Sequence, residues 1–200
     1  TGDATGTITV GFGALDRIAI LDDTNGNGSV IESLSFTTDE STTMYMAGYD
    51  ADDNYIRDVK VQWTVQGDIG EVNTGGIYTS STIFTATTIG TGVVQADSSV
   101  FEDETGIITV SGGSLSYLQI RDEGNGGGLS IGDISLTTDE SLTMYAAGYD
   151  ADDNYLSDQD VSWSVTGTLD AVTNSGSSIT FSPSTSSTSG TIVVSSGGVT

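Results

Sequence analysis

The chain has 200 residues, of which 28 are acidic, four are basic and none is histidine or cysteine. Its net charge of −24 at pH 7 repels phosphate and anionic lipid, which argues against nucleic acid or a membrane surface as a partner. Because histidine and cysteine are absent, the commonest catalytic bases and nucleophiles are missing, so we expect no catalytic residues and no enzyme. No stretch approaches the roughly 20 apolar residues that a membrane span needs, so we expect no membrane insertion.

The sequence repeats itself. AGYDADDNY at 47–55 recurs unchanged from 147, a period of 100 residues, and VQWTV at 61–65 recurs as VSWSV at 161–165. A period near 100 is the size of one β-sandwich domain. Strand-forming residues alternate with turn formers throughout, so we predict an all-β chain of two antiparallel sandwiches. The predicted boundaries are an N-terminal strand at 1–12, a first domain at 13–110 and a second domain at 111–200.

The first predicted element is TGTITV at 5–10, which recurs as TGIITV at 105–110. The later copy closes the first domain, whereas the earlier copy precedes any domain and has no place in one. In residues 5–10, Ile8 and Val10 alternate with Thr7 and Thr9, the pattern of a strand with one apolar face. The sequence therefore predicts a spare N-terminal strand.

Further strands follow in order along both copies. Val59, Val61, Trp63 and Val65 alternate with polar residues, which places them on the buried face of a central strand. A tryptophan in this position is typical of an immunoglobulin-like sandwich. The same alternation predicts the remaining strands in matched pairs, namely Ile18 and Ile20 with Leu118 and Ile120, Leu34 and Phe36 with Ile134 and Leu136, and Val93 and Val94 with Val193 and Val194.

These elements together resemble the bacterial Ig-like domains of invasin- and intimin-type surface proteins, the Big family. The resemblance rests on ALDRIAI, then TTDES before MYMAGYDADDNY, then DVKVQWTV, GTGVVQAD and TGIITV, and it covers nearly the whole chain. It implies an extracellular or cell-surface location and a role in stalks, adhesins or other surface structures. It implies no enzymatic activity.

The last strand of the second copy is missing from the 200 residues, so we expect an open edge there. The predicted acceptor edge consists of Thr191, Ile192, Val193, Val194 and Ser195. A strand from residues 5–10 of another copy would fill this vacancy, and burying Ile8 and Val10 would stabilise the contact by roughly 1.5–3 kcal/mol each. Such a head-to-tail contact does not close on itself and generates a filament by donor-strand complementation. The equal alternative is a longer covalent array, in which residues 5–10 complete a preceding repeat.

The acidic turns at residues 50–54 and 150–154, both DADDN, are candidate calcium sites. Calcium prefers six to eight oxygen ligands, and closely spaced Asp and Asn supply them. The plain alternative is a turn in which Asp and Asn serve the backbone. A second motif, D-x-N-x-N-G from Asp23, begins like a calcium loop but has leucine where the final glutamate belongs. The candidate ligands are Asp50, Asp52, Asp53 and Asn54, their copies Asp150, Asp152, Asp153 and Asn154, and Asp23, Asn25 and Asn27.

Function remains open between two classes at this point. The first is a structural subunit whose partners are copies of itself. The second is an adhesive module in a covalent array that binds a surface glycan or protein, for which tyrosines near the acidic turns, such as Tyr49 and Tyr55, offer contact area.

Overall fold

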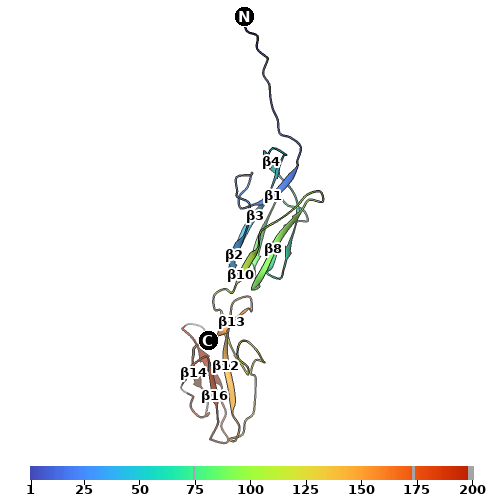
Figure 1. Ribbon diagram of the computed structural model, residues 1–200. Helices are drawn as coiled ribbons and strands as arrows, with labels where there is room; N and C mark the ends of the chain where they lie inside the picture. The colour runs from blue at the N-terminus through green and yellow to red at the C-terminus, as the bar shows by residue number, and fades with distance from the viewer. Residues whose placement is uncertain (74, 173, 198–200) are drawn as a thin grey trace. The chain divides into compact units, whose positions relative to one another are not determined.

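The computed structural model describes residues 1–73, 75–172 and 174–197. The chain divides into two compact units, domain 1 (Thr1–Ser111) and domain 2 (Gly112–Thr200), whose elements are drawn in Figure 1. The secondary structure of the described residues consists of β-strands, which confirms the predicted all-β fold. No helix suited to crossing a membrane occurs in this part of the chain.

One sheet of domain 1 is built around its longest strand, β3 (Ser41–Tyr49). Met44 and Met46 of that strand point into the core on either side of the half-buried Tyr45, and the strand is buried on both faces at Met46, Ala47 and Gly48. All neighbours in this sheet are antiparallel. The sheet runs β1 (Arg17–Leu21), β3, β7 (Ser81–Ala86) and β6 (Gly70–Asn73), with β4 (Tyr55–Asp58) also paired to β3.

The second sheet of domain 1 holds the last strand of the domain in its interior. β10 (Ile108–Ser111) lies between β2 (Leu34–Thr37), to which it is parallel, and β8 (Gly90–Asp97), to which it is antiparallel. On its other side β8 pairs with β5 (Gln62–Gln66). Beyond the residues paired to β10, the side of β8 that faces β10 pairs with the short β9 (Glu102–Glu104). Because β10 joins β2 to β8, this sheet depends on it.

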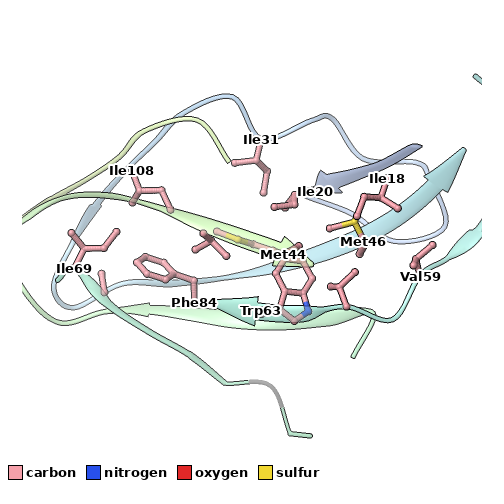
Figure 2. Packing of buried hydrophobic residues seen from close by; sticks show 14 of the residues in the cluster. Ile18, Ile20, Ile31, Met44, Met46, Val59, Trp63, Ile69, Phe84 and Ile108 are labelled. Atoms are coloured by element: carbon pink, nitrogen blue, oxygen red, sulfur yellow. The ribbon is translucent and has the colours of Figure 1, made fainter. Parts of the chain in front are cut away.

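The core of domain 1 lies between these two sheets, and Figure 2 shows its side chains. Trp63 is buried as the alternation predicts, and its Nε1–H donates to the carbonyl of Thr79 at 3.1 Å. Phe84 packs in the same cluster from the opposite sheet. Ile108 and Val110 of β10 are also in the cluster, with 0% and 2% of their surface exposed. The final strand is therefore part of the core.

Domain 2 repeats this plan with fewer strands. Its Trp163 is buried and donates to the carbonyl of Gly176 at 2.9 Å, in the manner of Trp63. One sheet contains β11 (Tyr117–Arg121), β12 (Leu142–Tyr149) and β13 (Tyr155–Asp158), with β16 (Ser178–Phe181) on the other side of β12; the second contains β15 (Asn174–Gly176), β14 (Val161–Val165) and β17 (Ile192–Ser195).

The match of Val93 and Val94 with Val193 and Val194 is wrong by two residues. Trp63 lies opposite Ala96 and Trp163 lies opposite Val194, so β17 is offset from β8 by 98 residues rather than 100. Gly190 accordingly takes the place of Gly92, and a side chain at either glycine would collide with a backbone carbonyl, that of Gln66 at Gly92 and that of Thr166 at Gly190. The shift arises in the connections before β17, where the two copies share no motif.

The strand expected at Ile134 and Leu136 is also absent from the second copy. Residues 134–137 have no strand pairing, and Ile134 is 54% exposed. The physical reason is visible in domain 1, where β2 is paired only to β10. In the described part of domain 2 no strand corresponds to β10, so residues 134–137 have no ladder to join.

Candidate assembly site

Domain 2 contains a groove of about 890 Å³ between residues 132–138 and residues 185–192. The apolar part of its lining includes Ile120, Leu136, Leu142, Leu169, Phe181 and Ile192, which belong to or pack against the core of domain 2. In domain 1 the corresponding flanks are β2 and β8, and the strand between them is β10. The groove therefore has the position that Ile108 and Val110 fill in domain 1.

Asp170 holds one rim of this groove and was missed by the sequence reasoning. Its Oδ2 accepts the backbone N–H of Ser184 and of Thr185, the latter at 3.0 Å, and its Oδ1 accepts the Thr185 hydroxyl at 2.7 Å. These bonds, led by that from Ser184 N–H, lower the pKa of Asp170 to about 2. Position 70 is glycine in the first copy, so the repeat gave no signal for this residue.

The predicted acceptor edge lines the groove only at Thr191 and Ile192, and its other three residues lie beyond the groove. Ile192, Val193, Val194 and Ser195 form β17, which pairs on one side with β14. With the offset of 98 residues, the partners of β10 on β8 correspond to residues 188–190, and the partners of β9 correspond to residues 193–195. The predicted edge therefore corresponds mainly to the part of β8 that β9 covers.

The predicted assembly strand is exposed along its whole length. Residues 1–14 have no secondary structure, and all of them are exposed. The exposed fractions of the apolar side chains are 75% for Ile8, 88% for Val10 and 69% for Phe12. Thr7 and Thr9 are exposed as well. An apolar face of this kind is unpaired within domain 1, whose equivalent position is already occupied by β10.

The acidic turn of each domain is organised around one buried carboxylate. Asp50 Oδ1 accepts the backbone N–H groups of Asp52 (3.1 Å) and Asn54 (2.9 Å), and Asn54 Nδ2 donates to the same carboxylate. Asp50 Oδ2 accepts the N–H of Gly13 at 2.9 Å. The bonds from Gly13 and Asn54 lower the pKa of Asp50. Asp150 repeats this arrangement with Asp152, Asn154 and Gly113.

Asp53, Asp153 and the predicted ligands of the Asp23 loop have side-chain partners other than Asp50 and Asp150, or a backbone role. Asp53 forms an ion pair with Arg17 at 2.9 Å, and Asp153 accepts the hydroxyl of Tyr117 at 2.7 Å, which raises the pKa of that tyrosine to about 12. In the other loop, Asp23 accepts the N–H of Thr24, Asn27 donates to Thr24, and Asn25 adopts a positive φ. Within the described residues no group of three or more acidic side chains could hold a metal ion, and calcium binding stays a prediction.

The tyrosines near the acidic turns are packed rather than presented as a flat platform. Tyr49 and Tyr55 meet edge to face with ring centroids 6.1 Å apart, and both are half-buried. The Tyr55 hydroxyl donates to Asp58 at 2.8 Å. Burial and this carboxylate raise the pKa of Tyr55 to about 12. These contacts use the tyrosines within their own domain.

Comparison with known proteins yields structural neighbours only. No protein-family model and no curated protein matches the sequence. Among solved structures, domains 4–9 of the surface layer protein SbsC are 17% identical with a TM-score of 0.37 over 93% of this chain. FdeC, an Escherichia coli adhesin, is 17% identical with a TM-score of 0.39 over 92%. A fragment of intimin in complex with its translocated receptor is 15% identical with a TM-score of 0.31 over 91%.

The chain spans 30% of the SbsC fragment, 66% of the FdeC chain and 63% of the intimin fragment. All of the TM-scores quoted lie below 0.5, so the function has to be argued from the residues of this chain.

Proposed function

We propose that the protein is a structural subunit of an extracellular filament or surface stalk. Residues 5–10 of one copy complete domain 2 of the next copy, which makes a head-to-tail contact that propagates. The observation that carries the proposal is the groove in domain 2, which lies where β10 lies in domain 1, together with an exposed segment, Ile8 to Val10, that repeats Ile108 to Val110 of β10.

The register of the donated strand follows from domain 1. There Ile108 and Val110 lie opposite Gly92 and Gly90 of β8, and beside Leu34 and Phe36 of β2. In the acceptor, Ile8 then lies opposite Gly190 and beside Ile134. Val10 lies opposite Thr188 and beside Leu136. Residues 134–137 become a strand parallel to the donor, as β2 is to β10.

Burial supplies the driving force for this contact. Ile8 and Val10 pass from almost full exposure to a closed core, which stabilises the joint by roughly 1.5–3 kcal/mol for each side chain. The groove residues Leu136 and Ile192 are covered by the same step. Main-chain hydrogen bonds to both flanking segments add to this, each contributing about 0.5–1.5 kcal/mol.

The test is the assembly state of the purified chain and of the double variant Ile8→Asn/Val10→Asn, measured by sedimentation velocity and electron microscopy. Both residues are exposed and contact no core in the free chain, so the variant folds as the parent does. We expect the parent to form filaments and the variant to remain monomeric.

The matched control is Thr7→Asn/Thr9→Asn, which changes the opposite face of the same strand. We expect this control to assemble, because the equivalent Ile107 is 63% exposed in domain 1 and Thr109 is exposed too. A parent chain that stays monomeric at every concentration would overturn the proposal in favour of the covalent array. Filaments that persist in the Ile8→Asn/Val10→Asn variant would overturn it as well.

A further inference from the structure

We infer that the donated element is longer than one strand and extends back to Asp3, with Gly6 fixing its position in the acceptor. This inference rests on the proposed function and names the part of the partner copy that the acceptor recognises. Residues 3–6 would take the place of β9 and the residues that join it to β10.

In domain 1, residues 103–106 precede β10 and contact β1, β8 and the connection that leads into β2. Asp103 in β9 is half-buried, and its Oδ2 accepts the N–H of Ile20 in β1 at 2.7 Å. Thr105 is buried and exchanges two hydrogen bonds with Val94, one through its N–H (2.9 Å) and one through its hydroxyl (3.0 Å). The segment therefore ties β1 of one sheet to β8 of the other.

Gly106 makes the closest approach in this segment. Its N–H donates to the carbonyl of Ile31 at 3.1 Å, and a Cβ built on it would overlap the carbonyl of Glu32. The backbone of Glu32 belongs to the connection that leads into β2. A side chain at this position is therefore excluded by main-chain atoms, which have little freedom to move aside.

The N-terminal segment repeats these contact residues selectively. Between residues 102 and 111, the positions that are buried or half-buried are Asp103, Thr105, Gly106, Ile108 and Val110. All five are identical at the equivalent positions, which are Asp3, Thr5, Gly6, Ile8 and Val10. Of the exposed positions only Thr109 is kept, while Glu102, Glu104, Ile107 and Ser111 are replaced. The identity between the two segments therefore extends beyond residues 5–10 to Asp3, and it coincides with the positions that are buried or half-buried in domain 1.

Domain 2 supplies the matching partners. The carbonyl of Ile120 accepts the N–H of Ile131 at 3.0 Å, as that of Ile20 accepts the N–H of Ile31. The Ile120 N–H is therefore placed to donate to Asp3, and the Ile131 carbonyl is placed to accept from Gly6. Ile192 corresponds to Val94 with the offset of 98 residues, which makes it the partner of Thr5. Gly132 stands where Glu32 closes on Gly106.

The experiment compares Gly6→Val with Gly2→Val in the full chain. Neither glycine has any atom within 4 Å of a built Cβ, so neither substitution disturbs the free subunit. We expect Gly6→Val to reduce assembly at least tenfold in sedimentation velocity, because the new side chain meets the backbone of residue 132. We expect Gly2→Val to assemble like the parent, because the equivalent residue is the exposed Glu102.

A second pair of variants tests the side-chain contacts, with Thr5→Val expected to weaken assembly and Thr7→Val expected to leave it unchanged. Normal assembly of both Gly6→Val and Thr5→Val would overturn the inference. If the Ile8→Asn/Val10→Asn variant still failed to assemble, the proposed function would stand with a shorter donor. If that variant also assembled, the proposed function itself would fail.

Discussion

Asp50 connects two parts of domain 1 through its carboxylate. It joins its own turn, through Asp52 and Asn54, to the incoming chain at Gly13. Asp150 does the same for Gly113. Gly13 comes shortly after residues 5–10, and Gly113 comes shortly after β10. Because the N–H of each glycine donates to the aspartate, the chain at this point is fixed to the acidic turn of the domain that begins there.

We expect Asp50→Asn to lower the melting temperature of domain 1 by several degrees at pH 7, because an amide group replaces one of the two acceptor oxygens. The hydrogen bonds depress the pKa of Asp50 in the folded state below its ordinary 3.8. The stabilisation is therefore present above the unfolded-state value and is lost as the pH falls through the folded-state value. The difference in melting temperature between parent and variant should shrink below about pH 4.

Asp52→Asn is the matched control, since Asp52 is exposed in the same turn, and its melting temperature should equal that of the parent. A parent and an Asp50→Asn variant that melt together at pH 7 would contradict the prediction. The same melts with added calcium or with a chelator check the calcium prediction. An identical melting temperature in both solutions would leave Asp50 as an organiser of the turn only.

At the scale of elements, residues 134–137 are the segment whose structure should change on assembly. In the unassembled chain we expect the amide hydrogens of residues 134–136 to exchange at least about tenfold faster than those of residues 34–36, where Leu34 N–H donates to Ile107. Thr137 is left out of the comparison because its N–H donates to Glu140 at 2.7 Å, as that of Thr37 does to Glu40. In filaments, the amide hydrogens of residues 134–136 should exchange as slowly as those of the equivalent residues in β2. Hydrogen exchange with mass spectrometry on both forms measures this, and protection in monomers would contradict it.

The sequence predicted those elements whose partners lie within the same copy. The alternation around Trp63 and Trp163 is decisive because one face of each strand is buried by its own domain. Residues 134–137 carry the same alternation as β2, yet a strand also needs a ladder partner, and periodicity does not report whether one is present.

The register of β17 and the role of Asp170 could not be predicted for a different reason. The offset of 98 residues is set by connections of unequal length, and neither connection carries a motif that both copies share. Asp170 caps a loop whose counterpart is absent in domain 1, so comparison of the copies gave no reason to select it. The assembly strand predicted at residues 5–10 rests on the opposite signal, which is its close match to residues 105–110.

At the scale of the whole molecule, charge opposes the proposed assembly. Each chain carries −24, so copies repel one another until salt screens them, with a screening length of about 10 Å at 0.1 M and 3 Å at 1 M. We expect filament mass, measured by light scattering, to increase between about 0.05 and 0.5 M sodium chloride. The Ile8→Asn/Val10→Asn variant should remain unassembled throughout. A loss of filaments with added salt would instead indicate attraction between charges at the joint.

The turn before β9 has a consequence for the proposed assembly, because it keeps β9 and β10 at the groove of their own domain. Residues 98–101 form a tight turn in which Ser98 N–H and the Ser98 hydroxyl both donate to the carbonyl of Phe101 at 2.9 Å. This turn tethers β9 and β10 to β8, which gives them an effective concentration on the order of millimolar at their own groove. A tail from solution would arrive at a far lower concentration with the same contact residues, so displacement of β9 and β10 is unfavourable. In the proposed assembly, domain 1 is therefore closed to exchange, and only domain 2 of each copy accepts a tail.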